Sequence, residues 1–444
     1  MVRGFTSRVI ACCAVSTVVF GLVSVAGPAM ADSGYSRHDA NFSSDHSGND
    51  SGHHRHHDDR NAAIFVSPQG SSTNSGWSCD DATFTSINAA VAAAPIGGTV
   101  IVCEGTYKED VLVNKALTLK SEDAFIDATG LENGIHVVAS DVNVDGFRIE
   151  NANGEGVLVG VDALTDAALL PAAGPVLSDV NLEGVTANNN DKGFNGTETP
   201  NCQYPGDCGG GVHLNGTTHS SVKDSTVNGN SDGVLLTDDY APSSYNLIEG
   251  NVVDGNLSEC GIVLPSHSQG AVTLDANNKV TAVNPTVGGV YGNVVRDNIA
   301  DDNGTKKAPA LFGGGGSGSG IGLFGSGPGS AVYNNLIVGN EASGNGLAGL
   351  AMHAHKPGGE DIDGNAIVHN DFGNNNVGGD GFDGGPTDFQ TTGIAIYSAV
   401  PANMVISHNT IHDDSIGIWL STTINAQGLN HNHFDNVTTP VVVG

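Results

Sequence analysis

Five titratable residues in the middle of the chain are suited to acid–base chemistry. They are two adjacent aspartates and three histidines: Asp238, Asp239, His267, His353 and His355. A histidine titrates near neutrality, so it can give or take a proton during a reaction. Two carboxyl groups at a suitable separation can cleave a glycosidic bond when one of them is kept protonated. We therefore predict these five residues as catalytic candidates.

Aromatic residues lie near the same segments, although aromatics make up only 5% of the chain. The candidates for substrate contact are four rings and one cation: Tyr240, Phe324, Tyr397, Trp419 and Lys356. Rings stack on the apolar faces of sugars, while carboxylates and imidazoles bind sugar hydroxyl groups. This combination indicates a carbohydrate site. The alternative is that exposed His and Asp residues are scattered along the fold without forming a common site.

Metal binding is a second use that the histidines could have. His353 and His355 are two residues apart, so on a strand they would share one face and could chelate a metal with a third ligand. His267 is expected about 10 Å from them, which argues against a closed zinc site. Asp- and Asn-rich turns at 297–303 and 361–371 offer oxygen ligands to Ca²⁺. We expect that no cofactor is required and that Ca²⁺ is the metal ion the chain could bind.

A glycine followed by an apolar residue, any residue and a second apolar residue recurs along the chain. The repeats begin at Gly134, Gly156, Gly211, Gly233, Gly261, Gly320, Gly349, Gly393 and Gly417. Most gaps between them are 22 to 29 residues long, and the intervening phrases end in Asn or Gly, which tolerate left-handed turns. A period of this length built from short strands predicts a solenoid, because the hairpin signals of a sandwich are missing.

The repeat predicts an all-β fold, a single parallel β-helix of about ten coils. The first and third residues after each glycine would point inward, and the second, fourth and sixth would face solvent on one long sheet. Asn side chains would form ladders along the turns. Before the repeat, Asp81 or Thr83 could cap a helix at 84–94 that covers the N-terminal end of the stack, and strands are expected at 99–103 and 111–119.

The N-terminus has the features of a secretory leader. Residues 1–31 contain Arg3 and Arg8, then an apolar stretch and an Ala-Met-Ala cleavage site. Residues 32–61 form a His-, Asp- and Ser-rich segment that we expect to be disordered, and residues 62–444 would form the β-helix domain. The protein is therefore expected to be secreted and extracellular, without membrane contact once the leader is removed.

Five cysteines remain after the leader, so at least one is unpaired. Cys79 with Cys103 would tie together the first turn of the domain, and Cys202 with Cys208 would close a small loop. Cys260 lies directly before an expected strand, where a buried structural thiol is typical.

The chain is strongly acidic, with 16 Lys and Arg residues against 48 Asp and Glu residues and a formal net charge of −32. Such a surface repels nucleic acid and anionic membranes, which excludes a nucleic-acid role. It also repels a polyanionic substrate unless Ca²⁺ bridges the two. The expected partner is therefore an extracellular polysaccharide that is neutral or weakly charged.

A resemblance to a known family rests on residues 83–121, which read TFTSINAAVAAAPIGGTVIVCEGTYKEDVLVNKALTLKS, and on the repeats that follow. Residues 62–444 resemble secreted right-handed parallel β-helix proteins of the pectate-lyase-like superfamily. This superfamily holds lyases, glycosidases, epimerases and non-catalytic members, so the fold does not decide the reaction. Asp238, Asp239 and His267 resemble part of a polygalacturonase site, although Asn215 stands where that site has a third Asp and the Arg-x-Lys element is absent.

Together these features predict a secreted carbohydrate-active protein that binds and cleaves or modifies a polysaccharide. Hydrolysis is favoured over β-elimination, because elimination at a uronate needs a cation at the substrate carboxylate and only Lys356 lies near the candidate site. Two alternatives stay open. One is a non-catalytic glycan-binding or structural β-helix protein, and the other is a uronate lyase or epimerase.

Overall fold

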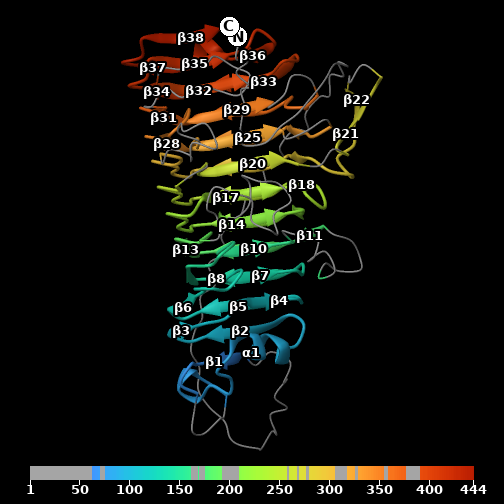
Figure 1. The fold of residues 1–444 in the computed structure, drawn as a ribbon, viewed down its shortest axis with the longest axis vertical. Helices are drawn as coiled ribbons and strands as arrows, with labels where there is room; N and C mark the ends of the chain where they lie inside the picture. The colour runs from blue at the N-terminus through green and yellow to red at the C-terminus, as the bar shows by residue number, and fades with distance from the viewer. Residues whose placement is uncertain are drawn as a thin grey trace, which may run out of the picture.

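The chain winds into a rod of stacked coils (Figure 1). The computed structural model describes residues 63–70, 76–161, 169, 176–192, 210–257, 260–267, 270–276, 280–305, 318–325, 329–354, 359–376 and 391–444. Strand β1 and helix α1 lie at the blue end of the rod, and β38 lies at the red end. The leader at 1–31, the segment at 32–61 and the pair Cys202 and Cys208 fall outside the described residues.

Two long parallel sheets run along the rod. A sheet of 12 strands comprises β1 (Ile64–Val66), β2 (Gly98–Val102), β5 (Leu117–Ser121), β8 (Val142–Asp145), β12 (Val180–Glu183), β16 (Ser221–Lys223), β19 (Leu247–Glu249), β24 (Val294–Arg296), β27 (Leu336–Val338), β30 (Ala366–Val368), β33 (Ala402–Ser407) and β36 (Ile424–Gln427). A sheet of 11 strands, which we call the glycine sheet, comprises β4 (Val111–Val113), β7 (Ile135–Val137), β10 (Val157–Val159), β14 (Gly210–Asn215), β17 (Asp232–Thr237), β20 (Ile262–Ser266), β25 (Ile321–Gly325), β29 (Leu350–Ala354), β32 (Thr392–Tyr397), β35 (Ile416–Leu420) and β38 (Thr439–Val443).

Shorter parallel sheets complete the coils. One contains β11 (Leu177–Ser178), β15 (Thr217–Thr218), β18 (Ser243–Ser244), β23 (Val290–Tyr291) and β26 (Val332–Tyr333). Two others contain β3 (Gly105–Tyr107), β6 (Ala124–Asp127), β9 (Arg148–Glu150) and β13 (Thr186–Asn188), and β28 (Glu341–Ser343), β31 (Asp371–Gly373), β34 (Thr410–His412) and β37 (His433–Asp435). The antiparallel pair β21 (Val272–Leu274) and β22 (Val280–Val283) projects from the rod in Figure 1. This architecture confirms the parallel β-helix predicted from the repeat.

The inward positions of the glycine sheet are those predicted. The residue after each glycine pairs with its equivalent in the next coil, as Val234 does with Ile262 and Ile321 does with Leu350. These residues and those two positions further on are fully buried in one continuous core. The core is therefore a stack of aliphatic rungs.

The repeated glycines are required because the coil is narrow at their positions. A Cβ atom at Gly211 would lie 2.0 Å from Cγ1 of Val227, and one at Gly134 would lie 2.2 Å from Cγ2 of Ile149. Real Cβ atoms do not approach other atoms so closely. Close packing across the interior thus explains the period that the sequence displays.

Asparagine ladders run along the turns, as expected. In one ladder each side-chain amide donates a hydrogen bond to the asparagine of the next coil, through Asn251, Asn298, Asn340, Asn370, Asn409 and Asn432. A second ladder contains Asn190, Asn230, Asn256, Asn303, Asn345 and Asn375, and it ends at Asp414. These bonds satisfy buried amides at every corner that they occupy.

A short helix covers the N-terminal end of the stack, but it starts later than predicted. Helix α1 (Ile87–Ala93) is capped by Ser86, whose side chain accepts a hydrogen bond from the Ala89 N–H at 3.3 Å. The carboxylate of Glu109 accepts two further helix N–H groups, from Ile87 at 2.8 Å and Asn88 at 3.0 Å. Asp81 and Thr83 are therefore not the cap, because the charge that satisfies the helix N-terminus comes from the first coil.

The strand expected at 111–119 is two strands, β4 and β5, which belong to different long sheets. The chain turns a corner between them, at 114–116. Lys115 in this corner donates hydrogen bonds to the carbonyls of Ala92 at 2.9 Å and Ala94 at 2.8 Å. The corner thus caps the C-terminus of α1, where a cation is favourable. The apolar alternation has the same phase on both sides of the bend, with Lys115 in place of an apolar residue, so the two strands read as one interrupted strand.

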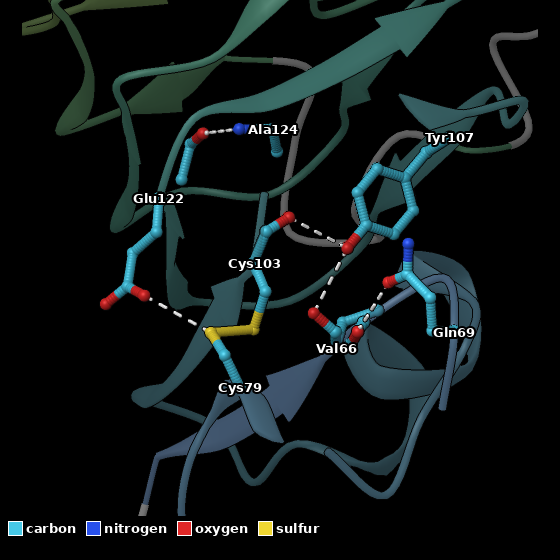
Figure 2. Close-up of a disulfide and its surroundings, with 9 residues drawn as sticks. Val66, Gln69, Cys79, Cys103, Tyr107, Glu122 and Ala124 are labelled. Atoms are coloured by element: carbon cyan, nitrogen blue, oxygen red, sulfur yellow. Dashed lines mark hydrogen bonds between the residues drawn. A yellow bond between two sulfur atoms is a disulfide. The ribbon is translucent and has the colours of Figure 1, made fainter. Parts of the chain in front are cut away.

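The Cys79–Cys103 disulfide is present and ties the N-terminal loop to the end of β2 (Figure 2). Beside it, the hydroxyl of Tyr107 lies 2.9 Å from the carbonyl of Cys103 and 3.1 Å from that of Val66. Burial raises the pKa of Tyr107, so it stays a donor. Cys260 is a buried thiol, as expected. In the described part of the chain, none of the helices combines the length and the apolar character needed to cross a membrane.

Candidate functional site

The outward row of the glycine sheet is buried, so the expectation that it faces solvent is wrong. Buried members of this row include His136, Leu158, His213, Leu235, Val263, Phe324, Ala351, His353, Ala395 and Trp419. Parallel register places equivalent side chains side by side, as Ala351 with Ala395 and Ala395 with Trp419. The apolar members from Leu235 to Trp419 therefore form a second hydrophobic cluster outside the main core.

The predicted sugar-stacking rings belong to this outer cluster rather than to an open platform. Phe324 is 1% exposed and Trp419 is 5% exposed. The Phe324 ring lies 4.5 Å from the His353 ring, and Tyr397, which is partly buried, stacks on Trp419 at 6.5 Å. The rings pack against their neighbours in adjacent strands, where Phe324 pairs with His353 and Trp419 pairs with Ala395. Tyr240 is partly buried and follows Asp239 directly.

Asp239 and His267 meet at the carboxyl ends of two adjacent strands. Val234 of β17 pairs with Ile262 of β20, so the same register places Asp239 opposite His267. Nδ1 of His267 lies 2.6 Å from Oδ1 of Asp239. The side chains of His267 and Asp239 are 1% and 8% exposed. The spacing of 28 residues in the sequence is thus one complete coil, and it produces a carboxylate–imidazole dyad.

The surroundings hold Asp239 as a carboxylate. Its Oδ2 accepts hydrogen bonds from the side-chain amide of Asn215 at 2.8 Å and from the hydroxyl of Thr237 at 3.2 Å. Burial alone would raise the pKa of Asp239, but the facing His267 and these hydrogen bonds outweigh burial and hold the pKa below its usual range. Asp239 therefore orients His267, and His267 is the group of the dyad that is suited to exchanging a proton.

Asp238 has a different task from its neighbour. It is fully buried, and its carboxylate accepts hydrogen bonds from the Ser266 hydroxyl at 2.9 Å, from the His267 N–H at 2.6 Å and from the Gly289 N–H. These bonds fix the turn that carries His267. Asp238 thus supports the turn that carries His267, whereas Asp239 contacts the imidazole itself.

Two residues absent from the predicted site extend the dyad across the sheet. Nε2 of His213 lies 2.7 Å from the Thr237 hydroxyl, and Nδ1 of His213 lies 3.1 Å from Oε1 of Glu155. Glu155 comes immediately before a repeat glycine, and His213 is the second residue after the next one. The two residues are 58 residues apart in the sequence, and no local pattern marks them as neighbours.

The other predicted site residues are not joined to the dyad by described contacts. His353 lies on β29, two strands from β20 in the glycine sheet, and it is buried against Phe324. His355 and Lys356 fall outside the described residues. Among the residues that the structure describes, no three His, Cys, Asp or Glu side chains are grouped to hold a metal ion, and Ca²⁺ binding stays a prediction.

Solved structures with the same architecture include several enzymes that act on polysaccharides or oligosaccharides. A GH136 lacto-N-biosidase from Eubacterium ramulus has a TM-score of 0.51 at 12% identity, covering 86% of this chain and 67% of the other. A pectate lyase has a TM-score of 0.45 at 15% identity over 78% of each chain. The A-module of a mannuronan C-5 epimerase from Azotobacter vinelandii has a TM-score of 0.42 at 16% identity, covering 80% and 91%.

No family model and no curated protein matches the sequence. At identities of 12% to 16% the likeness to solved structures concerns the fold and not the reaction. The chain is accordingly a right-handed parallel β-helix, the fold that its resemblance to the pectate-lyase-like superfamily implies.

Proposed function

We propose that this protein is a secreted enzyme that cleaves an extracellular polysaccharide, with His267 as the group that transfers a proton. The observation that carries the proposal is the dyad of Asp239 and His267, in contact at 2.6 Å. A carboxylate that fixes one ring nitrogen leaves the other nitrogen oriented for acid–base catalysis. The solved β-helix structure named as a lacto-N-biosidase supports a carbohydrate substrate.

Hydrolysis is the reaction that we favour. The acidic chain, with a net charge of −32, disfavours a polyuronate unless a cation bridges it. In hydrolysis a water oxygen bonds to the anomeric carbon as the glycosidic C–O bond breaks, and His267 would take the proton that this water loses. The imidazolium, stabilised by Asp239, would then give that proton to the oxygen of the leaving sugar. Asn215 would keep Asp239 in place through its amide.

β-Elimination or epimerisation at a uronate is the second candidate. The carboxylate of Asp238 is engaged by two backbone N–H groups and the Ser266 hydroxyl. Asp238 is therefore not available as the second carboxyl group that hydrolysis usually uses, and this favours elimination. The dyad then supplies one base for abstracting a proton next to the substrate carboxylate. Lys356 would be the cation that neutralises that carboxylate.

A non-catalytic glycan-binding or structural protein is the third candidate. It is favoured by the burial of the His267 side chain, which is 1% exposed. A ring so deeply covered can serve as a structural partner of Asp239. Only a measurement of turnover separates this candidate from the two enzymatic ones.

The test is turnover of a polysaccharide panel by the purified protein and by His267→Asn, Asp239→Asn and His433→Asn. New reducing ends identify hydrolysis, and ultraviolet absorbance of an unsaturated uronate identifies elimination. We expect His267→Asn to reduce turnover by about 10²- to 10⁴-fold, the usual contribution of a proton-transfer group. His433 is exposed on β37, so His433→Asn should act like the wild type. Wild-type turnover by a folded His267→Asn variant would show that the dyad is not the site.

A further inference from the structure

One buried ion pair takes no part in the proposed reaction. Glu155 and His213 are 2% and 1% exposed in their side chains, and Oε1 of Glu155 lies 3.1 Å from Nδ1 of His213. The pair lies on the outer side of the glycine sheet, on the coils that precede β17. Burying two ionisable groups is unfavourable unless their interaction compensates. The contacts of Glu155 and His213 must therefore offset the cost of burying them.

Thr237 joins this pair to the dyad. Its single hydroxyl lies 2.7 Å from Nε2 of His213 and 3.2 Å from Oδ2 of Asp239. A carboxylate only accepts hydrogen bonds, so the hydroxyl must donate to Asp239. The hydroxyl oxygen must then accept from His213, and Nε2 of His213 must carry a hydrogen. Without that arrangement, two acceptors would face each other at one of these contacts.

Hydrogen-bond geometry also fixes the number of protons that Glu155 and His213 hold together. If Glu155 is ionised, Nδ1 of His213 must donate to it, and His213 is an imidazolium with hydrogens on both nitrogens. If His213 is neutral, its Nδ1 accepts, and Glu155 must be the protonated partner. In both cases the pair holds one proton more than a neutral histidine and a carboxylate would hold.

We propose that Glu155, His213 and Thr237 are positioning residues that hold Asp239 in its ionised form, and so assign proton exchange to His267. In both arrangements the Nε2–H of His213 donates to the Thr237 hydroxyl, which donates to Asp239, and in the first of them His213 is also a cation. A nearby cation and a donated hydrogen bond both stabilise a carboxylate. This inference rests on the proposed function, because it names the residues that prepare the same dyad.

Other titratable groups lie near this chain of contacts. On β17 itself, the buried Asp232 accepts a hydrogen bond from the Cys260 N–H at 2.9 Å. On β7, Nε2 of His136 donates to the carbonyl oxygen of Gly160 at 2.7 Å. After β20, His267 faces Asp239 from the other side. Asp238 points to the turn below the sheet. The described hydrogen bonds between His213 and Asp239 thus pass through Thr237, and the charge of His213 also acts on Asp239 directly.

The first test needs no substrate. We would record the titration of the Asp239 carboxyl carbon and the nitrogen shifts of His213 by NMR in the wild type and in Thr237→Val, Thr237→Ser and Thr217→Val. Among the described residues nothing hydrogen-bonds the hydroxyl of Thr217, which is also fully buried, so Thr217→Val is the matched control. Thr237→Val should raise the titration midpoint of Asp239 by about one pH unit, the lower end of the effect of a nearby charge.

Thr237→Ser keeps the hydroxyl and should retain the wild-type midpoint, as should Thr217→Val. A His213 without a hydrogen on Nε2 would overturn the inference, because Thr237 would then donate away from Asp239. An unchanged midpoint in folded Thr237→Val would overturn it as well.

The second test measures the pH dependence of turnover. A higher Asp239 titration midpoint means that the carboxylate is lost earlier as the pH falls, so Thr237→Val should lose activity first on the acidic side. At a pH well below both midpoints its turnover should be about tenfold lower than that of the wild type, because a midpoint one pH higher leaves a tenth as much carboxylate. If the wild type turns over no glycan, the proposed function fails and the NMR titration still decides this inference. If the wild type is active and Thr237→Val loses turnover at the same acidic pH as the wild type, the inference fails and the function stands.

Discussion

At the scale of single residues, two adjacent aspartates serve opposite purposes. Successive residues of an extended chain point to opposite faces. Asp238 therefore points to the turn below the sheet and binds N–H groups, whereas Asp239 lies on the outer face opposite His267. The pair Asp238 and Asp239 looks like a double carboxyl site in the sequence, and only the alternation along the strand separates their roles.

Asp414 is a second aspartate whose surroundings change its chemistry. It ends an asparagine ladder and accepts the Asn375 N–H at 3.1 Å. Burial raises its pKa to about 7, and this hydrogen bond offsets burial only in part. The folded state therefore holds the proton to a higher pH than the unfolded state, and the stability of the protonated form is lost as the pH rises from about 4 to about 7.

We expect Asp414→Asn to stabilise the protein at pH 8 and to change little at pH 4. The amide can continue the ladder without a charge, and the gain above pH 7 should be up to about 4 kcal/mol, at about 1.4 kcal/mol per pKa unit. Denaturant unfolding at the two pH values would measure it. Asp435→Asn removes the same charge from an exposed position on β37 and should show no such difference. Equal effects of both substitutions would mean that Asp414 is ionised in the folded state without penalty.

At the scale of strands, the sequence predicts the inward side of the glycine sheet because the repeat glycines mark positions where no side chain fits. No Cβ fits at Gly211 or Gly134, so the repeat marks where each rung begins. The outward side carries no comparable signal. Leu235 and Trp419 are buried by neighbours in other coils, and Glu155 meets His213 across 58 residues of chain. Contacts between coils that follow an insertion are not visible in a local pattern, so the dyad was predictable and its extension was not.

The rung structure makes a direct prediction about stability. Leu420 of β35 is 1% exposed and pairs with Val443 of β38, which is 59% exposed. Leu420→Asp would bury an unpaired carboxylate among aliphatic side chains and should destabilise the fold by more than about 4 kcal/mol. Val443→Asp, one coil further on, should be nearly neutral. Thermal melts followed by circular dichroism would compare the two, and an unchanged melt of Leu420→Asp would contradict the inward register.

At the scale of the whole molecule, repulsion between coils is the main electrostatic feature of a chain with a net charge of −32. Asp301 illustrates it. The pKa of Asp301 is raised to about 6, first by burial and then by the neighbouring charges of Asp254 and Glu341, while a hydrogen bond from the Ser343 N–H lowers it. Repulsion of this kind is stored along the rod and is reduced by dissolved ions.

Added NaCl should therefore raise the melting temperature, because screening weakens the repulsion. CaCl₂ at equal ionic strength should raise it further if the turns at 297–303 and 361–371 bind Ca²⁺ in the folded state. Calorimetry in both salts, with MgCl₂ as a second divalent control, would separate screening from binding. No response to NaCl would contradict the proposed repulsion, and equal responses to NaCl and CaCl₂ would remove Ca²⁺ from the description.

The in-register stacking also bears on how such a molecule can change during evolution. Leu158 pairs with His213 across an insertion as regularly as Leu235 pairs with Val263 across an uninterrupted coil. Each coil is aligned by its neighbours and not by the length of chain that joins them. A lineage can therefore lengthen, shorten or replace the connections beside the glycine sheet while the strands keep their alignment. New specificity can arise on this scaffold by changes that leave Asp239 and His267 in register.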